Sequence, residues 1–251
     1  MTDSKTLAFI NLYSVLGSIP LLCKLDKNAA ELISGKNISI GIDVKNGPSA
    51  TLVFKNGECE LVDGCGKCNI KLGFSSPEKF NGMIDGTVTP IPSKGFTKIG
   101  FLLKNFTKLT DILSNYLRAS EKDLENEEFF NVSTKLMFGL ISSAITCIGN
   151  NDRIGKASAS YISDGVVKLG IGDDLCHYIV VKDHKLVLDD STEEKVSSYM
   201  IFNDIRLARE IFDGKQNAVA CVGTGKIRIG GMISQIDNVN RILDRVALYL
   251  A

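Results

Sequence analysis

The stretch FNDIRLAREIFDGK (202–215) has a counterpart earlier in the chain, FSSPEKFNGMIDGT (74–87), and the first phenylalanines of the two stretches align at an offset of 128 residues. Each stretch has the pattern of a short amphipathic helix that ends at a glycine, Gly86 in the first and Gly214 in the second. A glycine at this point is typical of the left-handed residue that follows a last helical turn. The chain is therefore predicted to form the same helix-and-turn unit twice.

The repeat extends to both sides of this unit. Upstream, ISIGIDVKNG (38–47) falls on VVKLGIGDDL (166–175) at the same offset, and LVFKNGECEL falls on IVVKDHKLVL after a one-residue slip. Downstream the offset becomes 130, and both copies then show an apolar stripe with spacings of four, three, four and three, which lies on one helical face. The stripe consists of Leu102, Phe106, Leu109, Leu113 and Tyr116 in the first copy and Met232, Ile236, Val239, Leu243 and Val246 in the second.

The charged segment ASEKDLENEE (119–128) separates the two copies, so we predict two tandem domains, 1–120 and 128–251. Each begins with an apolar helical segment, followed by short alternating runs bounded by Asn-Gly or Asp-Gly pairs, which indicate antiparallel strands and hairpins. A short helix, a further strand (TKIG, 97–100, or KIRIGG, 226–231) and a closing helix complete each copy. This order predicts an α+β domain, with a mostly antiparallel sheet covered by helices.

The glycine-rich stretch GTGKIRIGGM (223–232) has the composition of a phosphate-binding loop without its context. A dinucleotide-binding turn follows a strand and opens a helix whose N-terminus holds the pyrophosphate. Here the glycines flank Lys226 to Ile229, which alternates polar and apolar residues as a strand does. We expect a strand at this place and no phosphate site.

The composition restricts the class of protein. Of the 251 residues 44% are hydrophobic, and 29 basic side chains balance 29 acidic ones, so a core is expected and a nucleic-acid partner is not. No apolar run reaches the ~18–20 residues that cross a bilayer. The spaced Leu7, Ile10 and Val15 predict an amphipathic helix rather than a secretory signal. Seven scattered cysteines suit reduced thiols in a cytoplasmic protein.

The order of elements in the second copy resembles the sterol carrier protein 2 (SCP-2) family, in which a short helix ending at a glycine precedes a small linker, a glycine-bounded strand and a C-terminal helix. The residues that carry the resemblance are Phe202, Ile211, Phe212, Gly214, Gly225, Lys226, Ile227, Ile229, Gly231 and Met232. The first copy is reached mainly through the internal repeat, because PIPSKGFTKIGF departs from the glycine pattern. The resemblance implies two tandem SCP-2-like domains, each with a five-stranded sheet and helices around an apolar tunnel, and neither cofactor nor catalysis.

The function that follows from this resemblance is non-catalytic binding of a hydrophobic small molecule, such as a lipid, fatty acyl or sterol-like compound, for carriage or transfer. Burial of each methylene contributes about 0.8 kcal/mol, so an acyl chain binds without a charged anchor. The candidate pocket residues are Phe202, Ile211, Phe212, Met232, Ile236, Val239 and Leu243 in the second copy and Phe74, Met83, Leu102, Phe106, Leu109 and Leu113 in the first.

Core packing is the competing interpretation of each candidate, because any core-facing helix shows such residues. The alternative function is a protein-interaction or accessory module with filled cores and no tunnel. We expect the two domains to pack on each other, and leave transient membrane contact and a homodimer open.

The remaining groups of cysteine, histidine and acidic residues give little support for a metal, redox or catalytic site. Cys65 and Cys68 form a CxxC pair that suits half a zinc site or a redox pair, but no second CxxC or nearby histidine completes four ligands. A thiol-dependent enzyme using this pair is the weakest alternative. His177 and His184 lie in strand-like runs without a nucleophile motif, and DDSTEE (189–194) lacks the ligand spacing of a calcium loop. We therefore predict no catalytic residue, metal or cofactor.

Overall fold

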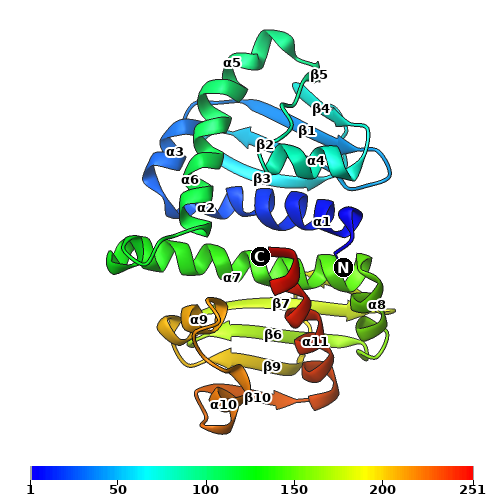
Figure 1. The fold of residues 1–251 in the computed structure, drawn as a ribbon, viewed down its shortest axis with the longest axis vertical. Helices are drawn as coiled ribbons and strands as arrows, with labels where there is room; N and C mark the ends of the chain where they lie inside the picture. The colour runs from blue at the N-terminus through cyan, green and yellow to red at the C-terminus, as the bar shows by residue number, and fades with distance from the viewer. Residues whose placement is uncertain (1, 251) are drawn as a thin grey trace. The chain divides into compact units, whose positions relative to one another are not determined.

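The computed structural model describes residues 2–250 and divides the chain into two compact units. Unit 1 ends at Leu136 and unit 2 begins at Met137. Each unit contains one five-stranded sheet together with helices (Figure 1), which confirms the α+β class and the mostly antiparallel sheets. The division falls inside helix α7 (Glu127–Asn151). The limits 1–120 and 128–251 remain the predicted limits of the duplicated domains.

Unit 1 opens with a helix that changes pitch along its length, followed by a short helix and the sheet. The helical segments are α1 (Ser4–Ile10), the π turn η1 (Asn11–Val15), the 3-10 turn η2 (Leu16–Ser18), α2 (Ile19–Leu25) and α3 (Lys27–Ile33). The strands are β1 (Ile38–Val44), β2 (Ser49–Lys55), β3 (Glu58–Asp63), β4 (Ile70–Phe74) and β5 (Pro92–Lys94), with α4 (Pro77–Ile84) before β5. The closing helix consists of η3 (Phe96–Lys98), α5 (Ile99–Phe101), the π turn η4 (Leu102–Phe106) and α6 (Thr107–Leu117), and η5 (Asp123–Glu125) leads to α7.

Unit 2 repeats this order with more regular helices. After α7 come α8 (Arg153–Ala159) and the strands β6 (Gly165–Ile171), β7 (Leu175–Lys182), β8 (Lys185–Leu188) and β9 (Val196–Phe202). The remaining elements are α9 (Ile205–Phe212), α10 (Ala218–Gly223), β10 (Ile227–Gly231) and the closing helix α11 (Ile233–Leu250). The glycine-rich stretch therefore contains a strand, as predicted, while α10 in the linker before it was not foreseen.

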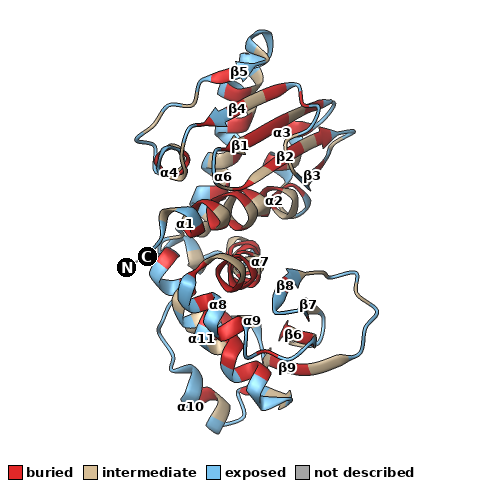
Figure 2. Ribbon diagram, turned by 90° about the vertical axis from the view of Figure 1, so that its right-hand side faces the viewer, coloured by how far each residue is buried: buried red, intermediate tan, exposed pale blue. Residues whose placement is uncertain are grey.

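The two sheets have the same topology. The strand order is β3-β2-β1-β4-β5 in unit 1 and, read in the same direction, β8-β7-β6-β9-β10 in unit 2. In each sheet the first and fourth strands pair in parallel at the centre, as β1 with β4 and β6 with β9. All other strand pairs in the two sheets are antiparallel. The inward residues of each sheet pack under the helices to form the buried layer that Figure 2 shows in red.

The short helices α4 and α9 end in the same way. The Gly86 amide donates to the Met83 carbonyl, and the Gly214 amide donates to the Ile211 carbonyl. Both glycines have positive φ, of 73° and 69°. The predicted left-handed glycine after each helix is confirmed, because a residue without Cβ takes this conformation without steric cost.

One strand match was wrong by one residue. Val44 pairs with Phe74, and Ile171 pairs with Phe202, so Val44 corresponds to Ile171 rather than to Gly172. The change of offset by one residue between the two copies, which was predicted only for the following hairpin, is therefore already present in the first strand of each sheet. That hairpin turns at Asn56-Gly57 in unit 1, where both residues have positive φ. In unit 2 the same turn is formed by Asp183 and His184, also at positive φ, so His184 lies in a turn and not inside a strand.

The strand predicted at Thr97 to Gly100 was also wrong, because these residues lie in η3 and α5. The edge strand of unit 1 is β5, whose three residues include a proline and show no alternation. The strand of unit 2 that corresponds to β5 is β10. Gly95, which follows β5, matches Gly231, which ends β10, and the two glycines have φ of 88° and 82°. A Cβ at Gly95 would lie 2.3 Å from the Asn69 carbonyl oxygen, and one at Gly231 would lie 2.1 Å from the Ser197 carbonyl oxygen. Only glycine fits either place.

The closing helices match at an offset of 133 rather than the predicted 130. The residues Leu102, Phe106, Leu109, Leu113 and Tyr116 correspond to Gln235, Val239, Ile242, Val246 and Tyr249, and the buried positions of the two helices then coincide. The two tyrosines make the same bond. The Tyr116 hydroxyl donates to Asp26 (2.7 Å), which caps α3, and the Tyr249 hydroxyl donates to Asp152 (2.8 Å), which caps α8.

Two helical stretches are long and apolar enough to cross a bilayer by length and composition alone, contrary to our expectation. They are Ser4–Leu25 and Glu127–Asn151, and 61% and 78% of their most apolar windows is buried inside the protein. The core helices of a folded domain have the same composition, so this is weak support for a membrane span.

Candidate functional site

Two π turns distinguish the helices of unit 1. In η1 and η4 one extra residue per turn widens the helix, a distortion that often marks functional sites in proteins. The Thr107 hydroxyl donates to the Leu102 carbonyl (3.0 Å), which also accepts the Thr107 backbone amide across the widened turn. The regular α11 occupies the corresponding place in unit 2. The two widened turns lie in the opening and the closing helix of unit 1.

The last residue of each turn, Val15 and Phe106, lines an apolar cavity of about 280 Å³. Its lining comes from η1 and η2, the end of α4, the loop before β5, and the closing helix. The lining residues are Val15, Leu16, Met83, Ile84, Pro90, Phe106, Thr107, Thr110, Leu113, Ser114, Leu117 and Arg118. At roughly 30 Å³ for each water-sized group, this volume accepts about nine such groups, near the lower end for ligand pockets.

The polar residues of the lining lie along α6. The Thr110 hydroxyl donates to the Thr107 carbonyl (2.8 Å) and keeps only acceptor capacity for a ligand. Arg118 is exposed just beyond the end of α6, and within residues 2–250 its guanidinium makes no ion pair. The cavity therefore combines apolar walls with a few polar groups and one cation.

Three of the six candidate residues in the first copy line this cavity, namely Met83, Phe106 and Leu113. The other three, Phe74, Leu102 and Leu109, are buried in the surrounding core. Several lining residues were missed, because Val15 and Leu16 were assigned only to an opening helix, and Pro90 and Arg118 lie outside the apolar stripe. The widened helical turns that bring them together have no signature in the sequence.

The candidate residues of the second copy lie mostly in the core of unit 2. Phe202, Ile236 and Val239 are buried, and Ile211, Phe212 and Leu243 are half-buried. Met232 is 49% exposed and precedes α11 instead of lying on its buried face. Its predicted match with Leu102 was wrong for the reason given above, the shift of the closing helix by three residues. Contact of any of these residues with a ligand stays a prediction.

An aromatic cluster fills the part of unit 2 that corresponds to the cavity wall of unit 1. Phe212 occupies the position of Ile84, stacks on Phe138 (ring centroids 6.3 Å apart) and meets Phe202 edge to face (5.6 Å). Offset stacks and edge-to-face pairs stabilise a core beyond the area they bury. A large ring thus stands in unit 2 where a smaller aliphatic side chain lines a cavity in unit 1.

His177 belongs to the same cluster, with its ring 4.8 Å from that of Phe138. Its Nδ1 is 2.7 Å from an Asp190 oxygen, while its Nε2 is buried and has no hydrogen-bond partner within the described part of the chain. Burial raises the pKa of Asp190, but the bond and charge of His177 outweigh it, so the pKa lies below its ordinary value. An Asp–His pair of this kind resembles half a catalytic triad, yet no nucleophile is shown against Nε2.

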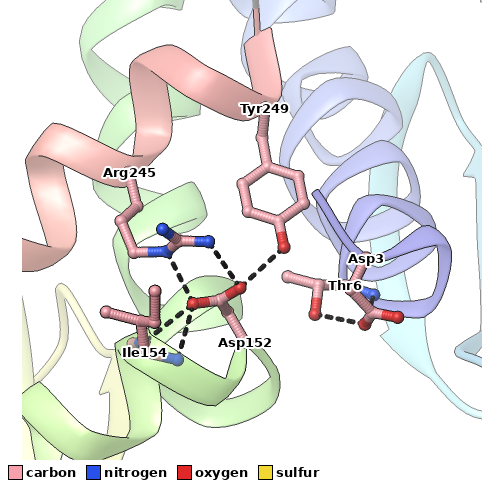
Figure 3. A network of polar contacts seen from close by, with 7 residues as sticks. Asp3, Thr6, Asp152, Ile154, Arg245 and Tyr249 are labelled. Atoms are coloured by element: carbon pink, nitrogen blue, oxygen red, sulfur yellow. Dashed lines mark hydrogen bonds and ion pairs between the residues drawn. The ribbon is translucent and has the colours of Figure 1, made fainter. Parts of the chain in front are cut away.

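The closing helix of unit 2 is tied down by a buried ion pair (Figure 3). Arg245 Nε lies 2.6 Å and its Nη2 2.9 Å from the two oxygens of Asp152, which also receives the Tyr249 hydroxyl. The Asp152 and Arg245 side chains are only 4% and 12% exposed. Burial raises the pKa of Asp152, but Arg245 and the Gly155 amide outweigh this and hold the pKa below its usual value. This cluster is structural, because the Asp152 carboxylate receives the Arg245 Nη2, the Tyr249 hydroxyl and two backbone amides, while Arg245 Nε pairs with it by charge and makes no hydrogen bond.

Cys65 and Cys68 lie together over Gly41 of β1. A Cβ on Gly41 would be 2.5 Å from one sulfur and 2.7 Å from the other, so only glycine leaves room for the pair. Burial raises the pKa of the Cys65 thiol, which keeps it protonated and weakly nucleophilic. Throughout residues 2–250 no group of three or more His, Cys, Asp or Glu side chains has the arrangement of a metal site. All seven cysteines are free.

Larger hollows in unit 1 do not suit an apolar molecule. One of about 650 Å³ lies between α3 and α6 and is lined mainly by asparagine, lysine and acidic side chains. Another of about 680 Å³ lies beside the Tyr116–Asp26 bond and contains both lysines and carboxylates. The cavity at the π turns is therefore the candidate site.

Two solved structures illustrate what this chain is similar to. No protein-family model and no curated protein matches the sequence. A structure described as UbiJ-SCP2, a ubiquinone synthesis protein, is 15% identical and covers 43% of this chain and 88% of its own, with a TM-score of 0.35. Sterol carrier protein 2 from Yarrowia lipolytica, in its apo form, is 16% identical and covers 40% of this chain and 91% of its own, with a TM-score of 0.30. These likenesses are too distant to carry an argument about function.

Proposed function

We propose that this protein binds a hydrophobic small molecule, such as a fatty acyl or other lipid-like compound, in the cavity of unit 1, without covalent chemistry. The observation that supports this proposal is the apolar cavity of about 280 Å³ to which both π turns contribute. At about 0.8 kcal/mol for each buried methylene, nine groups contribute roughly 7 kcal/mol before the ordering of the ligand is subtracted. Binding of this strength requires no catalytic residue or cofactor.

The proposal includes a duplicated, SCP-2-like architecture. Its support within the chain is the common strand order, the Gly95–Gly231 match and the Tyr–Asp bond that occurs once in each unit. The ligand site is placed in unit 1, where the cavity lies, although the second copy carries most of the sequence pattern of the family. We place the protein in the cytoplasm because its cysteines are free thiols.

The test uses Met83→Trp in the cavity wall and Ile211→Trp as a matched control. These half-buried residues occupy the same position of α4 and α9, so both substitutions impose the same steric change on the same fold. Isothermal titration calorimetry with octanoic acid as the probe, a chain close to the cavity in size, reports occupancy of the apolar site. We expect wild type and Ile211→Trp to bind this probe, and Met83→Trp to bind it at least tenfold more weakly, because the indole occupies the cavity.

Circular dichroism and urea unfolding establish that both variants are folded. Native mass spectrometry of gently purified protein, followed by extraction, identifies the molecule that is bound. Equal probe affinity in the two tryptophan variants, or no probe binding by the wild type, would contradict the proposal. Absence of binding with a stable fold would favour the accessory module with filled cores.

A further inference from the structure

Four large apolar side chains are exposed together in sequence between the cavity-lining residues Pro90 and Phe106 of unit 1. They are Ile91 (76% exposed), Phe96 (60%), Ile99 (40%) and Leu103 (67%). The last three are three and four residues apart in the continuous helical segment from η3 to η4, so they lie on one helical face. An apolar stripe on the solvent side of a helix is unusual in an unpartnered protein and indicates a contact surface.

Lysines are the only charged residues in this segment. Lys94, Lys98, Lys104 and Lys108 occur between Asp85 and Asp111, and the chain has no aspartate or glutamate between those two positions. Lys98 and Lys104 flank the apolar stripe, and neither forms an ion pair with a carboxylate of the described residues. The surface therefore combines apolar side chains with unneutralised positive charge, which is the pattern of interfacial helices that bind anionic lipid.

The same segment borders the candidate cavity. Pro90, one residue before Ile91, and Phe106, three residues after Leu103, both line the cavity. Figure 2 shows the chain beyond β5 as largely exposed, and Figure 1 places α5 near the tip of unit 1, where the π turn η4 connects it to α6. The exposed stripe and part of the cavity wall therefore belong to one stretch of chain, from Pro90 to Phe106.

We propose that the surface formed by Ile91, Phe96, Lys98, Ile99, Leu103 and Lys104 docks on an anionic lipid bilayer, from which the cavity takes its ligand. The docking surface is inferred from its exposed apolar side chains and its lysines alone, while the uptake of ligand rests on the function proposed above. A bilayer fits better than a protein partner, because lysine is depleted in protein–protein interfaces but is favoured beside anionic headgroups. The apolar side chains enter the boundary between headgroups and acyl chains, and the two lysines remain at its polar edge.

Cosedimentation of the full chain with vesicles tests the docking surface. One set of vesicles contains phosphatidylcholine alone, and the other also contains phosphatidylserine. We expect wild type to pellet with the anionic vesicles and the double variant Phe96→Ser/Leu103→Ser to bind them at least tenfold more weakly. The double variant Lys98→Gln/Lys104→Gln loses about fivefold for each lysine, and higher salt weakens the wild type toward the same level.

Matched substitutions elsewhere separate a surface effect from a general one. Val219→Ser removes an apolar residue that is 81% exposed in α10, and Lys185→Gln removes an exposed lysine in β8. Both should pellet like wild type. Pelleting of the Phe96→Ser/Leu103→Ser variant like wild type would overturn the proposal, as would a wild type that ignores anionic vesicles. A wild-type dimer that this variant abolishes, seen by sedimentation velocity, would instead assign the stripe to a contact between copies.

Octanoic acid binding in solution distinguishes this proposal from the previous one. The surface variants change residues outside the cavity lining, so they should bind the free probe like wild type. Vesicle binding without probe binding would retain the docking surface and reject the cavity function. Probe binding without vesicle binding would do the reverse.

Discussion

Unit 1 and unit 2 have the same sheet topology but differ in the regularity and the packing of their helices. The closing helix of unit 1 contains a 3-10 turn and a π turn and lines an apolar cavity, whereas α11 of unit 2 is regular and unit 2 contains an aromatic cluster. Ile84 lines the cavity in unit 1, and Phe212 fills the corresponding place in unit 2. The comparison teaches that one fold accommodates either an apolar cavity or a packed core, according to side-chain size and helix regularity.

A second difference lies in the tether of each closing helix, that is, in the aspartate that binds the tyrosine near the end of that helix. In unit 1 the half-buried Asp26 accepts one amide and the Tyr116 hydroxyl. In unit 2 the buried Asp152 accepts two amides, the Tyr249 hydroxyl and the guanidinium of Arg245. Residue 112, which corresponds to Arg245, is an isoleucine, so the ion pair belongs to unit 2 alone. Unit 2 is therefore held together more rigidly around its closing helix.

The largest expected effect comes from removing the shared aspartate. Asp152→Ala leaves the buried Arg245 without its partner and should lower the free energy of unfolding by about 3–5 kcal/mol. Asp26→Ala loses a helix cap and one hydrogen bond that water replaces, and should cost about 1–2 kcal/mol. Urea unfolding measures both, and hydrogen exchange in α11 and α6 assigns each loss to its unit. Equal losses would show that the two tethers do not differ as proposed.

The pH dependence of unfolding sharpens the same comparison. The folded-state pKa of Asp152 is lowered, so its contribution is complete above the unfolded-state pKa of about 3.9 and disappears as the pH falls through the folded value. The wild type should therefore lose stability below about pH 4 more steeply than Asp152→Asn, which has no proton to take up. Asp190 has a lowered pKa in the same unit and leaves a smaller acid dependence in the variant.

The next largest effect tests the alignment of the two units. Gly95→Ala and Gly231→Ala place a Cβ against neighbouring backbone at positive φ, and each should cost about 2–4 kcal/mol. Gly86→Ala and Gly214→Ala meet open space at similar φ and should cost about 1–2 kcal/mol. Urea unfolding of the four variants measures the difference. A small loss of unfolding free energy in Gly95→Ala together with a large loss in Gly231→Ala would show that the two glycines are not equivalent.

Some of the fold could be predicted because short-range chemistry determines it. The glycines after α4 and α9, the hairpin at Asn56-Gly57 and the strand in 227–231 each follow from local backbone preference. The edge strand β5 could not be predicted, because three residues with a proline carry no alternation. The closing helices were matched by their apolar spacing alone, and a stripe with this spacing also fits nearly as well when shifted by one turn. The Tyr116–Asp26 bond, which settles the match, joins residues 90 positions apart.

The candidate site was predictable only in part, for a similar reason. Met83, Phe106 and Leu113 were selected as apolar residues on predicted helical faces, and they do line the cavity. Apolarity does not distinguish them from Phe74 or Leu109, which lie in the core. The distinction depends on where two widened helical turns line one cavity, and backbone geometry of this kind is a result of packing rather than of local sequence.

The smallest expected effect concerns His177, and its sign is informative. His177→Phe removes the contact with Asp190, whose side chain is 49% exposed, and such a pair contributes about 0–1 kcal/mol even when charged. It also removes a buried Nε2 without a hydrogen-bond partner, a burial that costs about 1–3 kcal/mol. The new ring packs on Phe138 as the imidazole does, so urea unfolding should show a change near zero or a gain of about 1–2 kcal/mol.

A loss of more than 2 kcal/mol in His177→Phe would carry a different meaning. It would require that Nε2 receives a hydrogen bond in the folded protein, from a buried water or from a polar group of a ligand held among Phe138, Phe202 and Phe212. Native mass spectrometry of wild type and variant separates these two, because only a ligand adds mass that the substitution removes. Whether unit 2 has a packed core, in contrast to the cavity of unit 1, is therefore tested by whether His177 Nε2 receives a hydrogen bond. A bound molecule at that nitrogen would make both units binding domains.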